Sequence, residues 1–386
     1  MSTFALNENQ VMLAESARKY VERGYGSAVR AASLAHADGC SEERWAEFAE
    51  MGWLALPLPE VDGGLGGSVA DICVLAEDLG RGLVVEPWPA SGVLAATLLA
   101  TAGTPAQRAT WLPTLAAGDK RVAFAAWEPG SRFDATQVTA RAERVDGAYR
   151  LNGVKELALG APGADAVIVC ALCNSTGGST QPALFLLEAG MPGLDLQSYA
   201  TVDGRHAAHV RMQNLMAPEG ARLDATVDAA RAIRRALEEA ILVQCAETTG
   251  AMGRALEITL DYLKTRKQFG RVLASNQVLQ HRLVDLHVAI EEARALVRAA
   301  AIAVTTSDDD ERARYVAATK AYTSQAARLV WEEVVQLHGA IGMTDEYLIG
   351  AYVKHLAASH ALFGDAEQHL ERLAGIEDRF APSDDC

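Results

Sequence analysis

The sequence predicts an α+β fold in which a small β-domain lies between two helical regions. Apolar residues repeat with a helical period over roughly the first 118 residues. Up to about residue 224 the pattern changes to short runs with strand-like alternation. The helical period then returns in long segments joined by short loops, the pattern of a four-helix bundle. We therefore expect an N-terminal helical domain over 1–118, a middle β-domain over 119–224 and a C-terminal helical bundle over 225–386.

The first helical region contains three recognisable helix starts. Asn7, Ser41 and Thr104 each precede an amphipathic segment, and their side-chain oxygens suit a helix N-cap. Pro105, directly after Thr104, is favoured in the first turn of a helix. The glycine-rich stretch "LPEVDGGLGGS" predicts a loop between two of these helices.

The middle region contains a strong turn and a pair of spaced cysteines. Asp146-Gly147 between two alternating runs predicts a β-hairpin. Cys170 and Cys173 have the spacing of a metal or redox motif, but residues three apart on a strand point to opposite faces. We therefore expect ordinary buried cysteines and no metal site. The alternating runs are "RVAFAAWE", "QVTARAERV", "AYRLNGVKELAL", "ADAVIVCAL", "PALFLLEA" and "HAAHVRMQNL".

Composition and charge exclude several classes of protein. The net charge of -15 argues against nucleic acid, since phosphate binding needs a basic face. Six cysteines in 386 residues are too few for a disulfide scaffold. The N-terminus has no secretory-signal pattern, and the longest apolar run is too short to cross a membrane. We expect a cytoplasmic protein that binds neither nucleic acid nor membrane.

Two motifs in the C-terminal region favour an anionic ligand. "TRKQFGR", residues 265–271, places three cations around an aromatic residue and a glycine at the end of a long helix. A guanidinium suits a pyrophosphate because it donates in a planar fork, although a basic helix end also stabilises the helix dipole. "QLHGAIGMTDEY", residues 336–347, combines hydrogen-bonding side chains with small residues that permit close backbone approach.

The order and spacing of these motifs resemble the acyl-CoA dehydrogenase family over essentially the whole chain. The segments "YLKTRKQFG", "QVLQHRLVDL", "QLHGAIGMTDEY" and "LFGDAEQHLERLA" look closest to the branch of the pimeloyl-CoA dehydrogenase small subunit. The resemblance implies FAD, an acyl-CoA substrate, α,β-dehydrogenation and a homo- or heterotetramer, with an electron-transfer flavoprotein as one candidate acceptor. By the same resemblance, the residues that approach the adenine–diphosphate half of FAD at a subunit interface are Arg266, Gln268, Phe269, Gln277, Gln336 and Gly339.

The resemblance also locates the catalytic base, and there this chain departs from the family. The family's usual glutamate begins a turn 27 residues after Gln336, and that position is Phe363. The turn explains why Gly364 interrupts a helical pattern, because glycine costs about 1 kcal/mol in a helix interior. Some members carry the base on the long helix, at a position that here is Ala240. Neither residue can accept a proton.

Glu247 is then the best remaining base, on the same helix and flanked by small and apolar residues. The alternative is a buried glutamate paired with an arginine across the bundle. Glu346 is a weaker candidate, and Glu238 is expected on a solvent-facing side of the helix.

The β-domain departs from the family pattern as well. Where the family presents hydroxyls and a tryptophan to the flavin ring, this chain has Trp127, Leu157 and Leu159. Leucine cannot donate a hydrogen bond from its side chain. Three functions stay open: a dehydrogenase that uses an unusual base, a non-catalytic partner subunit of a heterotetrameric dehydrogenase, and a flavin oxidase or monooxygenase on the same scaffold.

Overall fold

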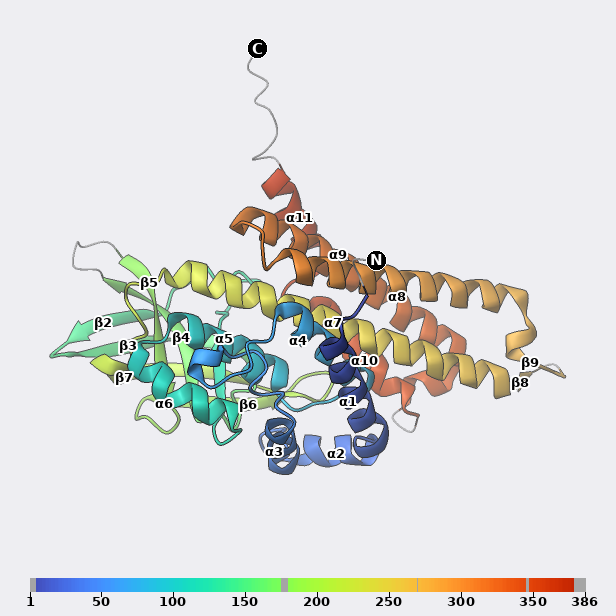
Figure 1. Ribbon diagram of the computed structural model, residues 1–386, viewed down its shortest axis with the longest axis horizontal. Helices are drawn as coiled ribbons and strands as arrows, with labels where there is room; N and C mark the ends of the chain where they lie inside the picture. The colour runs from blue at the N-terminus through green and yellow to red at the C-terminus, as the bar shows by residue number, and fades with distance from the viewer. Residues whose placement is uncertain (1–4, 175–179, 269, 345–346, 378–386) are drawn as a thin grey trace, which may run out of the picture. The chain divides into compact units, whose positions relative to one another are not determined.

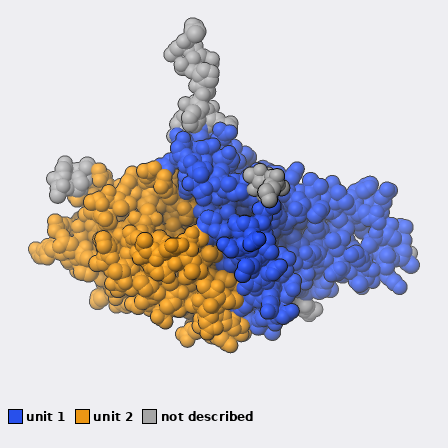
Figure 2. All heavy atoms as spheres, in the orientation of Figure 1, with its two compact units in different colours: residues 1–30, 68–84, 241–386 blue, residues 31–67, 85–240 orange. Residues whose placement is uncertain are grey.

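The computed structural model describes residues 5–174, 180–268, 270–344 and 347–377 (Figure 1). The chain forms two compact units, which Figure 2 shows in separate colours. Unit 1 comprises residues 1–30, 68–84 and 241–386, and unit 2 comprises residues 31–67 and 85–240. Long helices dominate unit 1, and a β-sheet with shorter helices makes up unit 2. The α+β class expected from the sequence is therefore confirmed.

The N-terminal helices of unit 1 begin where their capping residues predict. The Asn7 side chain accepts a hydrogen bond from Gln10 N (2.9 Å), and the Gln10 side chain accepts one from Asn7 N (3.1 Å). This reciprocal pair satisfies two of the backbone N–H groups that every helix start leaves free. Ser68 caps the next helix of the unit in the same way. The two helices are α1 (Glu8–Gly24) and α4 (Val69–Arg81), which pack against each other.

The C-terminal bundle is built from long helices, as the sequence predicts. In unit 1, α9 packs against α8, α10 and α11. Apolar residues of α7, α8, α9 and α10, such as Leu256, Ile290 and Val330, form one buried cluster. The last helical segment is broken in two near Phe363. The helices are α7 (Ala229–Thr265), α8 (Gln277–Ala303), α9 (Asp309–His338), α10 (Ile349–Ala361) and α11 (Ala366–Glu377).

Two glycines allow α4 and α7 to cross closely inside unit 1. A Cβ atom on Gly80 would lie 2.0 Å from the carbonyl oxygen of Glu247. A Cβ atom on Gly250 would lie 1.8 Å from the carbonyl oxygen of Glu77. Both separations are far shorter than a van der Waals contact, so the crossing requires a residue without a side chain at each position.

Unit 2 also contains short helices. Ser41 and Thr104 cap two of them, since each side chain accepts a hydrogen bond from a backbone N–H three residues on. A π-helical segment (Trp88–Ala95) is buried throughout most of its length, and the Trp88 indole donates to Trp53 O (3.0 Å). The α-helices are α2 (Ser27–Ala35), which continues from unit 1, α3 (Glu42–Glu50), α5 (Ala96–Ala102) and α6 (Pro105–Ala116).

The sheet of unit 2 runs in the order β1-β4-β2-β3-β7-β6, and β5 pairs along the whole of β4. The β2–β3 hairpin turns at Asp146-Gly147, where both residues have the positive φ that a two-residue turn of type I′ requires. The strands are β1 (Val122–Ala125), β2 (Arg141–Val145), β3 (Ala148–Leu159), β4 (Ala166–Asn174), β5 (Thr180–Glu188), β6 (Leu194–Ala200) and β7 (His206–Pro218).

The cysteines of β4 have the structural role that the sequence predicts. Cys170 and Cys173 are both buried, and each is a free thiol. Among the described residues, no group of three or more His, Cys, Asp or Glu side chains could hold a metal ion. No helix in the described ranges is both long and apolar enough to span a bilayer.

A fully buried ion pair joins two strand regions of the β-domain. Lys155 in β3 is 0% exposed, and its Nζ lies 2.7 Å from Glu128 Oε1. Glu128 also accepts hydrogen bonds from Thr139 N (2.7 Å) and Ala140 N (3.1 Å). Burial alone would raise the pKa of Glu128, but the hydrogen bonds from Lys155, Thr139 and Ala140 bring it below the usual range. The carboxylate therefore fixes the loop that leads into β2.

Candidate functional site

The hairpin after α7 carries the first binding motif. β8 (Lys267–Gln268) pairs antiparallel with β9 (Arg271–Val272). Arg266 continues the helical hydrogen bonding, since its backbone N donates to Tyr262 O (2.8 Å). The side chains of Arg266, Gln268 and Gln277 are all exposed, the last in the first turn of α8. Phe269, the remaining predicted residue of this motif, lies outside the described residues.

The second motif is the turn that ends α9. The helix stops at Gly339, whose positive φ of 67° suits glycine, and a 3-10 turn, η5 (Gly339–Met343), follows. Gln336 and Gly339 are exposed, whereas His338 between them is buried. His338 Nδ1 donates to Val334 O (2.9 Å), and burial lowers the pKa of the imidazole.

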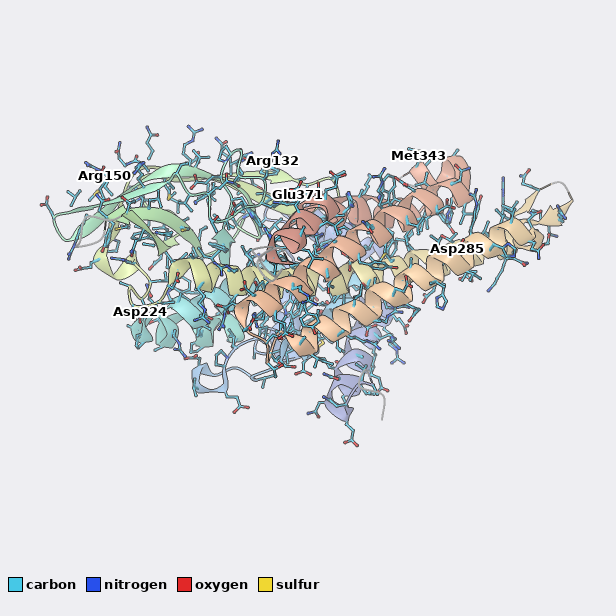
Figure 3. The ribbon with its side chains drawn as sticks, turned by 90° about the horizontal axis from the view of Figure 1, so that it is seen from above. Arg132, Arg150, Asp224, Asp285, Met343 and Glu371 are labelled. Atoms are coloured by element: carbon cyan, nitrogen blue, oxygen red, sulfur yellow. The ribbon has the colours of Figure 1, made fainter. Side chains whose placement is uncertain are left out.

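A ring contact brings the two motifs to the same end of the bundle. Tyr262, one turn before Arg266, stacks on His338 with ring centroids 4.5 Å apart and donates to His338 O (3.3 Å). Met343, labelled in Figure 3, is 78% exposed in the same turn. We call the exposed predicted binding residues the hairpin-end surface, which consists of Arg266, Gln268, Gln277, Gln336 and Gly339.

The break in the C-terminal helix is a tight turn with positive backbone angles. Phe363 has φ of 63°, which is uncommon for a residue with a side chain, and Gly364 follows with φ of 101°. His369 Nε2 donates to Phe363 O (2.9 Å), and Asp365 caps α11 by accepting from Gln368 N (2.9 Å). Phe363, at the position where the resemblance leads us to expect the family's base, is 7% exposed, so a buried aromatic ring fills this turn.

Buried polar side chains surround this turn. Lys320 in α9 and Gln244 in α7 both donate to Ser359 O near the end of α10, at 2.8 and 3.2 Å. His369 is fully buried, which lowers the pKa of its imidazole to about 4, and burial lowers the pKa of Lys320 to about 8. We call Gln244, Lys320, Ser359 and His369 the buried polar cluster. It ties α7, α9, α10 and α11 together behind Phe363.

Glu247 lies on α7 at the crossing with α4. It is 4% exposed, and its own carbonyl oxygen packs against Gly80. Glu238, which the sequence analysis places on a solvent-facing side, is 7% exposed, and that expectation is wrong. The neighbouring residues do not mark this position as interior, since the exposed Arg231 and Arg234 lie within two turns of it on the same helix. Glu346 lies outside the described residues.

The β-domain positions that correspond to ring contacts carry apolar groups. Trp127 is buried, and its ring packs edge-on against Phe133 at 5.3 Å. Leu157 has φ of 50° at a bulge in β3, where its side chain and that of Leu159 are half-buried. Neither leucine offers a side-chain donor to a flavin ring.

Sequence reasoning missed the buried polar cluster. Lysine and histidine are usually exposed or half-exposed, so nothing local marks Lys320 or His369 as interior residues. One signal was available: Lys320 continues the stripe of buried positions Val316, Ala317 and Ser324 at three- to four-residue spacing along α9. A lysine on the buried stripe of a helix therefore predicts an internal polar partner.

Comparison with known proteins identifies the family. The chain matches the acyl-CoA dehydrogenase N-terminal domain over residues 7–119, the middle domain over 123–215 and the C-terminal domain over 229–375. It is 30% identical over 368 residues to acyl-CoA dehydrogenase IpdE2 of Mycobacterium tuberculosis, covering 95% of this chain and 96% of the relative. The chain belongs to the acyl-CoA dehydrogenase family.

Solved structures agree with this assignment. The ChsE4-ChsE5 complex from Mycobacterium tuberculosis matches with a TM-score of 0.87 and 25% identity, covering 98% of this chain and 100% of that one. A variant of the Tcur3481-Tcur3483 steroid ACAD matches with a TM-score of 0.86 and 28% identity, covering 97% of this chain and 99% of that one. This protein is thus an acyl-CoA dehydrogenase or a subunit of one, an oxidoreductase with FAD as its cofactor.

The described residues suit the adenine–diphosphate half of FAD, but the leucine side chains offer no hydrogen bond to its flavin ring. The exposed guanidinium of Arg266 and the neighbouring amides suit the phosphates and the adenine. A flavin ring against Leu157 and Leu159 would receive no hydrogen bond from either side chain. When bound, FAD supplies the hydride acceptor, and the hairpin-end surface of this chain would hold its adenine–diphosphate half.

Proposed function

We propose that this chain is one subunit of a heteromeric FAD-dependent acyl-CoA dehydrogenase acting on a CoA thioester. In this proposal it supplies the hairpin-end surface, and a related subunit supplies the base and the ring contacts. The observation that carries the proposal is the absence of a proton acceptor at both family base positions, Phe363 and Ala240. A CoA thioester needs a positioned base to lose its weakly acidic α-proton, so the base must come from elsewhere.

Two further observations support this proposal. The solved structure of ChsE4-ChsE5, which this chain resembles in fold, is a complex of ChsE4 and ChsE5. The hairpin-end surface is exposed in the single chain, and a ligand of the size of FAD needs a covering partner to be buried to the usual extent.

We propose an electron-transfer flavoprotein as the electron acceptor and the cytoplasm as the location.

The assembly we propose is a tetramer formed through the C-terminal bundle. α8 exposes Val278, Val284 and Val288, which are 63%, 57% and 48% exposed. Val284 and Val288 are four residues apart and therefore share one face of the helix. Sedimentation should give a tetramer, and Val284→Asp with Val288→Asp should shift it to smaller species. A wild-type chain that sediments as a stable monomer, alone and with its partner, would contradict the proposal.

The absorption spectrum tests the heteromer directly. The chain purified alone should show little or no flavin absorbance. After co-expression with a related chain from the same organism, the copurified complex should show a flavin band that bleaches on addition of an acyl-CoA. A full flavin complement and substrate bleaching in the chain alone would contradict the proposal.

A second candidate is a complete homomeric enzyme that uses Glu247 as its base. One observation favours it: Glu247 is a carboxylate in the interior of the helical unit, 4% exposed, and a carboxylate is one of the side chains that can act as a general base. The same burial also suits a purely structural carboxylate. Substitution of Glu247, described below, separates the two candidates.

A further inference from the structure

The end of α10 leaves a carbonyl group that a continuous helix would use. α10 ends at Ala361, and Leu362 after it has an extended backbone (φ -63°, ψ 135°). In an uninterrupted α-helix, Ser359 O would accept a hydrogen bond from the backbone N–H of Phe363, four residues on. The positive φ of Phe363 ends this pattern. Ser359 O is therefore one of the carbonyls that a helix end leaves without a helical donor.

Two side chains from other helices take the place of that donor. Lys320 Nζ in α9 donates to Ser359 O at 2.8 Å, and Gln244 Nε2 in α7 donates to it at 3.2 Å. Lys320 and Gln244 are 1% and 2% exposed, so their contacts with the carbonyl lie away from solvent. A carbonyl oxygen has two lone pairs, and these two donors are enough to use both.

The charge of Lys320 is explained by this contact. Within the described ranges its one hydrogen-bond partner is Ser359 O, and the carboxylate of Asp365 acts on it only electrostatically. Burial lowers the pKa of Lys320 to about 8, so most of the side chain is charged at neutral pH. Burying a charge is unfavourable, and an apolar side chain of similar length would fill the same space without that penalty. The ammonium therefore contributes the hydrogen bond to α10.

The turn after α10 is strained and is held from its other side as well. Phe363 has φ of 63°, a left-handed conformation that is unfavourable for a residue with a Cβ atom. His369 Nε2 in α11 donates to Phe363 O at 2.9 Å. Strained backbone persists only where the surrounding structure over-determines it. The alternative is a turn in which Phe363 returns to negative φ, α10 continues and Ser359 O regains its helical donor.

We propose that Lys320 and Gln244 form a tertiary cap that selects the broken form of this two-state segment. By occupying Ser359 O from other helices, the tertiary cap removes the acceptor that a continued α10 needs and holds Phe363 at positive φ. Lys320 is the stronger half because its donor is charged. All of these residues belong to one chain, so the proposal does not depend on the proposed heteromeric function.

Hydrogen exchange of the full-length protein, measured by mass spectrometry over peptides that cover residues 359–369, tests the tertiary cap. Lys320→Met keeps the length of the side chain and removes the donor, so these amides should exchange at least tenfold faster. Gln244→Leu should accelerate exchange by a smaller factor, and it provides the same test if Lys320→Met does not fold. The matched control is Lys264→Met at an exposed position of α7, which should leave exchange within twofold of the wild type.

A second pair of variants separates the tertiary cap from general packing. In the Lys320→Met background, Phe363→Gly should restore part of the protection, because glycine adopts positive φ without strain. Phe363→Ala loses the same ring but keeps the Cβ atom, and it should restore none. Peptides from α1, in the same unit, should exchange as in the wild type throughout.

Three results would overturn the proposal. The first is unchanged exchange over residues 359–369 when either donor of the tertiary cap is removed. The second is equal acceleration in α1, which would mean that the variants weaken the whole unit and not the turn. The third is equal protection by Phe363→Gly and Phe363→Ala, which would mean that the backbone angle of this residue is not what the tertiary cap holds.

Discussion

The bundle of unit 1 has two polar regions. The polar side chains of one face solvent, and those of the other are buried and hydrogen-bonded inside the protein. At the hairpin-end surface, the side chains of Arg266, Gln268 and Gln277 are turned to solvent. In the buried polar cluster, Lys320 and His369 are inside the protein and donate to backbone carbonyls. Gln244 and Arg266 are 22 residues apart along the same helix and its continuation, or about 33 Å.

The difference supports the proposal that this chain retains only part of the family's machinery. Exposed donors at a helix end are available to a ligand or a second subunit. Buried donors that already bind carbonyls hold helices together and have little capacity left for a substrate. Under the proposed function, the chain therefore keeps the cofactor-binding end and uses the turn at Phe363 for internal structure.

Glu247→Gln tests this comparison most strongly, because the two candidate functions predict very different rates of flavin bleaching. In the proposed heteromer the base lies in the other subunit, so we expect acyl-CoA to bleach the flavin of the Glu247→Gln complex at the wild-type rate. General bases contribute roughly 10²–10⁴-fold to turnover. Stopped-flow absorbance measures the rate of flavin bleaching, and thermal unfolding checks that the variant is folded. Slowing of that size would instead assign the base to this chain.

His369→Gln sharpens the role of the buried polar cluster. The pKa of His369 is about 4 in the folded protein against 6.5 for the free side chain. The unfolded chain therefore takes up the proton first as pH falls, and about 3 kcal/mol of stability is lost between pH 6.5 and 4. Urea unfolding across this range should show a shallower pH dependence in His369→Gln. His287→Gln, at an exposed position of α8, is the control and should retain the wild-type slope.

Arg266→Ala tests the exposed region. Loss of a charge-assisted hydrogen bond to a phosphate costs roughly 1.5–3 kcal/mol, so FAD should dissociate from the assembled enzyme at least tenfold more readily. Flavin fluorescence after dilution reports the released cofactor. Arg282→Ala, which removes an exposed arginine on α8, should leave FAD retention unchanged. Full retention of FAD in Arg266→Ala would remove this residue from the cofactor site.

Gln268→Ala should have the smallest effect. A neutral hydrogen bond contributes about 0.5–1.5 kcal/mol, so FAD affinity should fall by a factor of roughly 2 to 10. The same fluorescence assay measures it, and the unfolding midpoint should not change because the side chain is exposed. A loss larger than that in Arg266→Ala would indicate that the amide, and not the guanidinium, is the main contact.

Local signals in the sequence predicted most of the fold. Asn7, Ser41 and Thr104 cap helices because short side chains act on backbone groups only three residues away. Asp146-Gly147 sets the β2–β3 turn for the same local reason. β6 (Leu194–Ala200) was missed because it is an edge strand with no buried residue, and its alternation of leucines with polar residues covers only Leu194 to Gln197.

The candidate site was less predictable because it depends on contacts between distant segments. The stacking of Tyr262 on His338 joins residues 76 positions apart, and no local pattern predicts it. The family resemblance supplied Arg266 and Gln336, but the roles of Lys320 and His369 follow only from three-dimensional packing. The interior position of Glu238 was likewise set by the surroundings of α7, not by its own polarity.

The glycine crossing of α4 and α7 limits how this protein can vary. At Gly80 and Gly250 even a methyl group would meet a backbone oxygen, and no side-chain rotation could relieve that overlap. In a library that randomises both helices, Gly80 and Gly250 should tolerate the fewest substitutions, fewer than the neighbouring alanines. The two glycines also fix the position of α7 along its axis relative to α4. A substitution at either one would therefore shift Glu247 and Arg254 together along that axis.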